Sequence, residues 1–216
     1  MLFRSRASED FQRGDHASAW FRFWSLAREG YAAAQFNLGQ FYRQGIGIAA
    51  DLAAARYWYA EAAAQGHPHA QYNLGLMYFW GKGIQQDYTE ALRWYRLAGE
   101  QGDALAQRDV GLIYSNGWGV PQDYAEAARW YLLAAERGDA QAQLNLGARY
   151  AKGQGVQRDL VEALKWFALA ARAGNEEIAG PAATNIERMK DAMTPSQVLR
   201  AQELVRQWQP IASLHN

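Results

Sequence analysis

Apolar positions in the middle of the chain follow the period of an α-helix. Between Gly66 and Gly81, the residues Ala70, Leu74 and Tyr78 recur at i, i+4 and i+8. This spacing places them on one face and predicts an amphipathic helix. We expect the helix to end at Gly81, because a left-handed residue after the last turn favours glycine.

A second apolar stripe follows after a short loop. Asp87 and Glu90 precede it in a pattern typical of a helix N-cap with a capping box, and Gly102 closes it. The apolar face of this second predicted helix carries Ala91, Trp94, Tyr95 and Ala98. The segment from Gly66 to Gly102 is therefore predicted to be a helix pair.

The helix pair recurs along the chain. Glycines stand at intervals of 36 residues, at Gly30, Gly66, Gly102, Gly138 and Gly174. The apolar stripes, small residues and caps recur at the same interval: Leu38, Leu74, Val110 and Leu146; Gly39, Gly75, Gly111 and Gly147; Tyr42, Tyr78, Tyr114 and Tyr150; Trp58, Trp94, Trp130 and Trp166; Asp51, Asp87, Asp123 and Asp159. A fixed period of this length is the signature of a solenoid, in which each unit stacks on the next.

The recurring positions can be written A-Q-x-N-L-G-x-x-Y-x-x-G-x-G-V-x-x-D-x-x-x-A-x-x-W-Y-x-x-A-A-x-x-G. This string resembles the Sel-one-like repeat family, a relative of the tetratricopeptide repeat. The stretch from Ala142 to Gly174 follows it nearly in full, with Phe167 where Tyr is usual, and the resemblance covers about residues 30–174. It implies an all-α fold, a right-handed superhelical solenoid of antiparallel helix pairs. It also implies an adaptor or scaffold that holds a peptide or protein partner. Some secreted members staple each repeat with a disulfide, whereas this chain has no Cys.

The repeats divide the chain into three parts. Residues 1–29 are predicted to form a degenerate N-terminal helix pair, residues 30–173 four full repeats, and residues 174–216 a degenerate repeat with a capping helix. In the last part we expect Gly180-Pro181 to interrupt the helical pattern and to start a helix that runs to about Asp191. Thr194-Pro195 is an N-cap and N1 pair, and the helix after it has an apolar face made of Val198, Ala201, Val205 and Trp208.

Composition narrows the choice of partners and compartment. The chain has 216 residues, with 22 basic and 22 acidic side chains, so no charge excess favours nucleic acid or an anionic membrane. No apolar run reaches the roughly 18 residues of a membrane span, and the first residues lack the apolar region of a signal peptide. We therefore expect a cytoplasmic protein without membrane insertion, or a periplasmic or secreted one if the native chain starts upstream of Met1.

The first helix of each pair is expected to line a concave surface, and the residues opposite its buried stripe are the candidates for partner contact. These positions differ between repeats, whereas the packing positions recur. The candidates are Phe36, Gln40, Arg43, His69, Tyr72, Leu76, Phe79, Trp80, Arg108, Leu112 and Asn116.

Tyr72, Leu76, Phe79 and Trp80 would form a large apolar patch on that surface. Exposed apolar patches mark binding sites, and aromatic residues and Arg are the usual interface anchors. One hypothesis is a groove for a peptide with an apolar segment and a carboxylate, which Arg108 would receive. The alternative is tight packing between neighbouring helices, which is favoured for Phe79, while the groove is favoured for Tyr72 and Trp80.

Other motifs have structural interpretations. Gly81-Lys82-Gly83 lacks the remainder of a phosphate-binding loop, and the same Gly-x-Gly recurs in every repeat, so it is interpreted as a helix connection. His67 and His69 have no third ligand nearby, and we expect neither a metal nor another cofactor.

The leading functional hypothesis is a non-enzymatic scaffold that binds a peptide or protein. A self-associating structural protein, whose groove takes a neighbour's tail such as residues 208–216, is the second. The third is an enzyme or small-molecule binder, since some relatives of the family are described as acting on or binding penicillin-type compounds. No Ser stands at motif spacing from a Lys or His to support catalysis.

Overall fold

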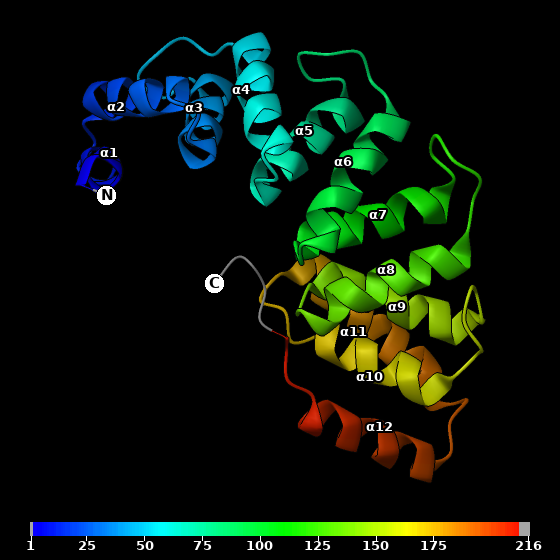
Figure 1. Ribbon diagram of the computed structural model, residues 1–216. Helices are drawn as coiled ribbons and strands as arrows, with labels where there is room; N and C mark the ends of the chain where they lie inside the picture. Colours follow the sequence, from blue (N-terminus) through cyan, green and yellow to red (C-terminus); the bar gives the residue numbers. More distant parts are fainter. Residues whose placement is uncertain (1, 212–216) are drawn as a thin grey trace. The chain divides into compact units, whose positions relative to one another are not determined.

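The computed structural model describes residues 2–211, and within them it consists of helices and connecting loops without strands (Figure 1). Helical structure with a period of 36 residues confirms the predicted all-α solenoid of antiparallel helix pairs. The helices are α1 (Leu2–Gln12), α2 (His16–Arg28), α3 (Ala32–Gln44), α4 (Leu52–Ala64), α5 (Pro68–Trp80), α6 (Tyr88–Glu100), α7 (Ala104–Asn116), α8 (Tyr124–Glu136), α9 (Ala140–Lys152), α10 (Leu160–Ala170), α11 (Glu176–Lys190) and α12 (Pro195–Gln207).

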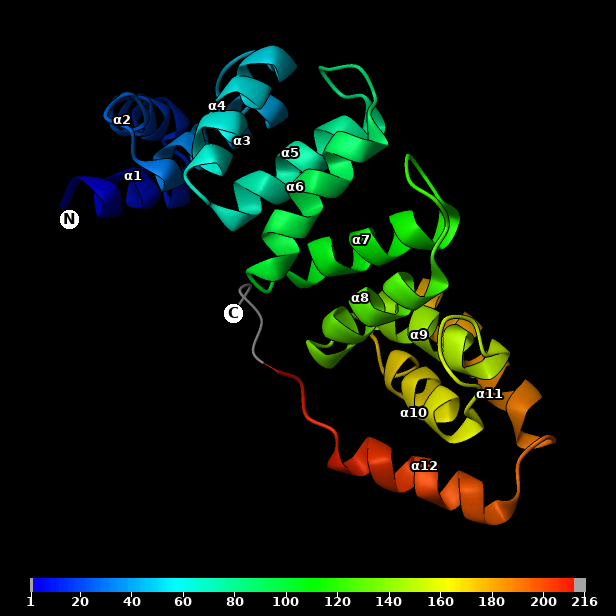
Figure 2. The ribbon, with the colours of Figure 1, turned by 45° about the vertical axis from the view of Figure 1, so that its right-hand side comes forward.

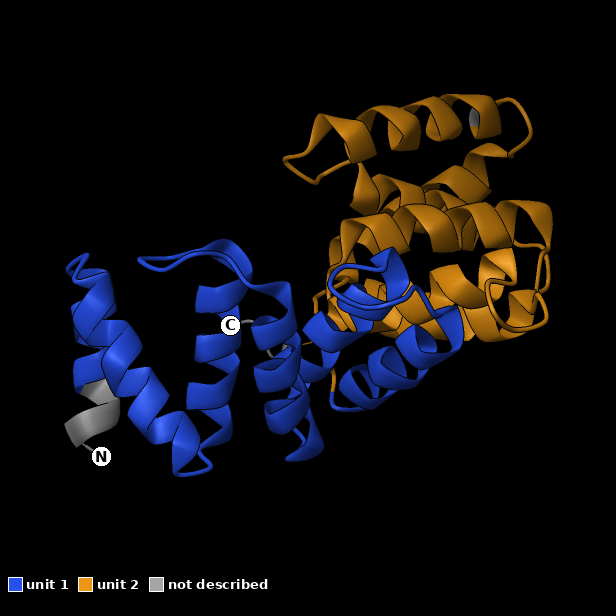
Figure 3. Cartoon of the chain, turned by 90° about the horizontal axis from the view of Figure 1, so that it is seen from above, with its two compact units in different colours: residues 1–101 blue, residues 102–216 orange. Residues whose placement is uncertain are grey.

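The helices fall into two compact units (Figure 3). Unit 1 comprises residues 1–101 with α1 to α6, and unit 2 comprises residues 102–216 with α7 to α12. In unit 1 the pairs α3/α4 and α5/α6 each pack as a hairpin, and α1/α2 precedes them. The described part of residues 1–29 is therefore helical, as the degenerate first pair predicts.

The ends of the helices follow the predicted signals. Asp87 caps α6, because its carboxylate accepts the N–H groups of Thr89 at 2.9 Å and of Glu90 at 3.0 Å. Gly81 ends α5 in the left-handed conformation, with φ of 65°. The capping box predicted at Glu90 is wrong: the Asp87 N–H donates to the Tyr78 carbonyl, and the Glu90 carboxylate binds Arg93 instead.

In each of the four full repeats, a tyrosine or phenylalanine ring of the second helix lies on a glycine of the first. A Cβ atom placed on Gly75 would lie only 2.6 Å from the ring of Tyr95, and the same contact joins Gly39 to Tyr59. Both rings are fully buried. Glycine recurs at this position because any larger residue would push the second helix away.

Within each unit, neighbouring pairs stack through the Gly-x-Gly loops. The second glycine lies against the start of the preceding second helix, so that a Cβ on Gly83 would lie 2.7 Å from Leu52 Cβ. Gly83 also has a positive φ of 72°. The loop therefore needs glycine for its backbone angle and for this close approach.

Buried glutamines add polar contacts between pairs, and the sequence analysis missed them. Gln71 of α5 donates its side-chain N–H to the Ala63 carbonyl at the end of α4, over 3.2 Å. Gln35 and Gln143 make the equivalent bonds, with Ala27 and Ala135 as acceptors. The only available signal was the recurrence of Gln beside the apolar stripe.

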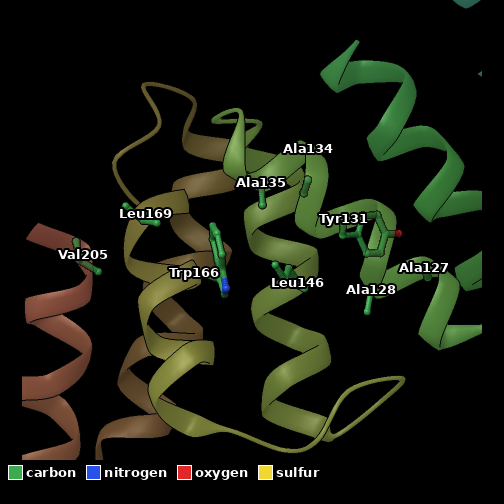
Figure 4. Close-up of a cluster of buried hydrophobic side chains, with 10 residues drawn as sticks. Ala127, Ala128, Tyr131, Ala134, Ala135, Leu146, Trp166, Leu169 and Val205 are labelled. Atoms are coloured by element: carbon green, nitrogen blue, oxygen red, sulfur yellow. The ribbon is translucent and has the colours of Figure 1, made fainter. Parts of the chain in front are cut away.

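The core of unit 2 extends from α8 to α12. Figure 4 shows Trp166 projecting from α10 toward Leu146 of α9, with Val205 of α12 on the other side of α10. Figures 1 and 2 show α12 alongside α10, which it contacts. Ala201 and Val205 are buried there, as expected for a helix that covers the last full repeat.

The predicted interruption at Gly180-Pro181 is wrong. Helix α11 begins at Glu176, with the Asn175 side chain accepting from the Glu177 N–H at 2.9 Å, and it continues through Pro181. Proline removes a single N–H from this helix. The carbonyl that loses its donor belongs to the exposed Glu177, where water can bind it. The N-cap predicted at Thr194 is confirmed, with a complete capping box.

Candidate functional site

A hollow of about 310 Å³ opens in unit 1 between α3, α5 and the start of α4, and we call it the α3–α5 hollow. Its wall combines apolar side chains with two cations. The lining residues are Arg43, Leu52, Asn73, Leu76, Met77, Trp80 and Lys82. Three predicted contact residues, Arg43, Leu76 and Trp80, therefore meet at one place.

The end of α5 positions the aromatic wall of the hollow. Gly81 stops the helix directly after Trp80, and the Lys82 N–H turns back to the Met77 carbonyl at 3.0 Å. The Trp80 side chain is 61% exposed, although its ring lies 4.9 Å from the ring of Phe79, which supports it from one side. An exposed indole held in this way can contact a partner at little cost in side-chain entropy.

The cationic wall is also held in place. Arg43 Nε donates to the Tyr59 hydroxyl at 3.2 Å, and Arg43 Nη2 donates to Gln40 Oε1 at 3.0 Å. Burial raises the pKa of Tyr59 above its ordinary value of 10.0, so the phenol stays protonated and donates to Gln40 Oε1. Both partners of Arg43 are neutral, so its positive charge is oriented without being compensated.

The second cation, Lys82, comes from the loop that follows α5. Its side chain is exposed. No carboxylate within residues 2–211 forms an ion pair with Lys82 or with Arg43. The sequence analysis treated Lys82 only as a loop residue and missed Leu52 and Met77. The available signal for Lys82 was that this loop position is Ile46, Trp118 or Gln154 in the other repeats.

Phe36, His69 and Tyr72 do not line the hollow. Each is half-buried and packs on other rings: Phe36 lies 4.8 Å from His67, and Tyr72 lies 5.6 Å from Tyr95. His69 lies 6.0 Å from Phe36. The structure therefore brings these three residues into ring contacts within unit 1 and leaves part of each side chain exposed.

Phe79 is a candidate for partner contact, although packing is the favoured interpretation for it, and it does not lie on the exposed face. Its side chain is only 7% exposed and packs against Tyr88 at 5.3 Å and Tyr95 at 6.3 Å. The last turn of α5 points this residue back toward α6, so Phe79 supports Trp80 and is part of the core. The packing interpretation holds for this residue.

The remaining candidates, Arg108, Leu112 and Asn116, belong to α7 in unit 2. Leu112 is half-buried, and the exposed Asn116 donates its side-chain N–H to the Leu112 carbonyl at 2.8 Å. The Arg108 guanidinium, a candidate for a partner's carboxylate, has carboxylates of its own unit beside it. It already pairs with Asp109 at 2.8 Å and with Asp139 at 3.4 Å.

The start of the chain's tail is held by unit 2. Trp208 packs on the core cluster of α8 to α12, and the Ile211 N–H donates to the Glu136 carbonyl at 2.8 Å. The hypothesis that residues 208–216 enter a neighbour's groove therefore meets an internal contact at Trp208. Residues 212–216 lie outside the described part of the chain.

Two further searches give no additional site. Among residues 2–211, no three His, Cys, Asp or Glu side chains gather closely enough to hold a metal ion. Over the same residues, no helix combines the length and the apolar character that crossing a bilayer requires.

Comparison with known protein families identifies the type of repeat. The model of the Sel1 repeat matches residues 32–67, 68–103, 104–139 and 140–175. The chain belongs to the Sel1 repeat family. Proteins built from Sel1 repeats are generally scaffolds for protein interaction and are typically not enzymes. A comparison with curated proteins finds no match.

Solved Sel1 structures share the fold. A Sel1 repeat protein from Oxalobacter formigenes is 31% identical with a TM-score of 0.81, and the alignment covers 95% of this chain and 85% of that one. The protective antigen c5321 of uropathogenic Escherichia coli is 29% identical with a TM-score of 0.54, covering 88% of this chain and 48% of that one. A Klebsiella pneumoniae protein described as a putative Sel1 repeat protein is 20% identical with a TM-score of 0.51, covering 85% and 89%, which shows the fold alone.

Proposed function

We propose that this Sel1 repeat protein is a non-enzymatic scaffold that binds a segment of a partner protein in the α3–α5 hollow. The observation that carries the proposal is the exposed Trp80, supported by Phe79, on a hollow of about 310 Å³ that Leu76 and Met77 also line. A supported aromatic residue beside a concave apolar surface is the usual anchor of a protein interface.

The residues that line the hollow can bind a ligand, but they do not form a catalytic arrangement. Its polar groups are a guanidinium, an ammonium and the amide of Asn73, whose N–H donates to the His69 carbonyl at 2.7 Å. None of these is a nucleophile paired with a general base, which covalent catalysis requires. The scaffold role therefore agrees better with these residues than an enzymatic one.

A capture experiment with matched variants tests the proposal. The test variant is Leu76→Ala/Trp80→Ala, and the control is Phe21→Ala/Leu199→Ala, which removes apolar side chains that are 60% and 62% exposed outside the hollow. Circular dichroism and thermal unfolding first establish that both variants are folded. We expect wild type and control to capture the same protein from host lysate and the test variant to lose at least about tenfold of it.

Equal capture by the test variant and wild type would contradict the proposal. Self-association, in which the groove takes the tail of a second copy, is the second candidate. Light scattering over a range of protein concentrations separates the two: a monomer throughout leaves the scaffold, whereas a dimer that Leu76→Ala/Trp80→Ala dissociates would place a second copy in the hollow.

A further inference from the structure

The α3–α5 hollow combines two chemical features, a pair of cations and an apolar wall. Arg43 and Lys82 supply two positive charges without carboxylate partners in the described part of the chain. Leu52, Leu76, Met77 and Trp80 supply an apolar surface. No Asp or Glu lines the hollow. The complementary ligand therefore carries a carboxylate next to an apolar group.

The size of the hollow favours a ligand that carries both groups on a single residue. A volume of about 310 Å³ accommodates one large side chain with the backbone that bears it. In an extended peptide, an internal acidic side chain and its apolar neighbour point to opposite sides of the chain. At a C-terminus, the apolar side chain and the α-carboxylate leave the same Cα, so both can enter one hollow.

Arg43 is oriented for such a ligand before binding. Arg43 donates to the Tyr59 hydroxyl and to Gln40 Oε1, and the fully buried Tyr59 in turn donates to Gln40 Oε1. A guanidinium that is already held loses less conformational entropy when it binds a carboxylate. Lys82 carries an exposed ammonium on the flexible stem of its side chain and adds charge without fixing geometry.

We infer that the α3–α5 hollow binds the C-terminal residue of a partner protein. The apolar side chain of that residue contacts Leu76 and Trp80, and its α-carboxylate is received by Arg43 and Lys82. This inference rests on the proposed scaffold function and specifies its ligand. It predicts a partner whose last residue is Leu, Phe or another apolar residue and whose C-terminus is accessible.

The first test compares peptides that differ only at the terminal group. N-acetyl-Gly-Gly-Leu and N-acetyl-Gly-Gly-Phe, each as the free acid and as the carboxamide, are titrated into the full-length protein. NMR follows the Trp80 indole N–H and the Lys82 backbone amide. We expect saturable shifts with the acids and at least about tenfold weaker binding of the amides. Equal binding of acid and amide, or no saturable shift with either acid, would overturn the inference.

The second test separates the two cations and the source of the carboxylate. Lys82→Gln and Arg43→Gln are each expected to weaken the acids several-fold and to leave the amides unchanged. Arg206→Gln, at an exposed cation that lines a different hollow in unit 2, is the control and should change neither. Because Arg43 also contacts Tyr59, Lys82→Gln is the decisive variant. N-acetyl-Glu-Leu-amide carries an internal carboxylate, and tighter binding of this peptide than of the free acids would overturn the terminal assignment.

The outcomes distinguish this inference from the scaffold function itself. If Leu76→Ala/Trp80→Ala loses the captured protein but acids and amides bind alike, the scaffold stands and the terminal carboxylate is excluded. If that variant still captures the protein, the proposed scaffold function is contradicted, and the inference that rests on it is contradicted as well. A captured protein that Lys82→Gln also loses, and that is no longer captured after carboxypeptidase treatment, would agree with both.

Discussion

At the scale of single residues, the first helices of the pairs differ in how their N-termini are capped. Asp103 and Asp139 cap α7 and α9, with carboxylates that accept the N–H of the third helical residue at 2.9 and 2.7 Å. In α5 the equivalent residue is His67, whose Nδ1 accepts from the Ala70 N–H at 3.3 Å. Only the neutral imidazole offers this acceptor. The cap of α5 therefore depends on pH.

The pH dependence has a defined sign. Burial and the nearby His69 lower the pKa of His67 below its ordinary value of 6.5. The unfolded chain therefore takes up this proton before the folded protein does. Stability from His67 is fully present above about pH 6.5 and is lost as the pH falls from there toward the lowered pKa.

We predict that His67→Asp removes this contribution. Between pH 7 and pH 5, wild type should lose about 0.5–1 kcal/mol more unfolding free energy than the variant, which is the usual value of an N-cap bond. Urea unfolding at both pH values measures it. Parallel losses in the two proteins would show that the His67 cap does not titrate in this window.

A second residue-scale feature accompanies the replacement of tyrosine by Phe167, although Tyr95 keeps its hydroxyl in a repeat whose equivalent position is the apolar Phe79. The Tyr59 hydroxyl accepts a hydrogen bond from Arg43, and the Tyr131 hydroxyl is hydrogen-bonded with Ser115. The equivalent position facing Phe167 is Ala151, which has no polar side chain. A buried hydroxyl there would lack a partner, so loss of the hydroxyl agrees with loss of the acceptor.

The buried glutamines give a further prediction. Gln143→Leu should destabilise unit 2 by about 1 kcal/mol, because the Ala135 carbonyl loses the hydrogen bond from the Gln143 side chain. Gln157→Leu, in an exposed loop, is the control and should stay within about 0.5 kcal/mol of wild type. Chemical unfolding of both variants measures the difference, and equal stabilities would mean that the buried bond contributes nothing.

At the scale of elements, the hairpins depend on glycine inside the first helix, where glycine normally weakens a helix. A Cβ on Gly147 would lie 2.8 Å from the ring of Phe167, whereas a Cβ on Gly180 in α11 would meet only the Glu176 carboxylate at 3.8 Å. The two glycines therefore have the same helix propensity and opposite packing environments.

We predict opposite effects of alanine at these two positions. Gly147→Ala should destabilise by about 1–2 kcal/mol, since overpacking exceeds the gain in helix propensity, and Gly180→Ala should stabilise by up to about 1 kcal/mol. Thermal unfolding compares them. Stabilisation by Gly147→Ala would mean that the ring of Phe167 can move aside and that the glycine is not a packing requirement.

At the scale of the whole molecule, a solenoid is stabilised by contacts between neighbouring pairs. Helix α12 covers α10 at the end of unit 2, where Val205 is 5% exposed and Leu199, on the same helix, is 62% exposed. The same substitution at these two positions therefore distinguishes the effect of lost packing from the effect of an added surface charge.

We predict that Val205→Asp lowers the protection of α10 and α12 against hydrogen exchange by about 100-fold, because a buried charge opposes packing. Helices α1 to α6 should keep their protection, since they belong to the other compact unit. Leu199→Asp should leave both regions unchanged. Loss of protection along the entire chain after Val205→Asp would show that the chain unfolds as one cooperative block.

The sequence alone determined the helices, their pairing and the period, because these depend on local signals that recur. The stripes of Leu74 and Tyr78, the caps at Asp87 and its equivalents, and the left-handed glycines such as Gly81 act within one turn or one hairpin. The same local signals gave a wrong prediction at Gly180-Pro181, where the carbonyl that loses its donor belongs to the exposed Glu177.

The tertiary structure alone decided which surface residues meet. Leu52 and Arg43 reach the same hollow as Trp80 only because the Gly83 loop lies against the start of α4. Helical periodicity could not show that Phe79 turns into the core or that Asp109 and Asp139 occupy Arg108. These outcomes depend on how side chains from different helices pack and pair with one another. The spacing of residues within one helix contains no information about those contacts.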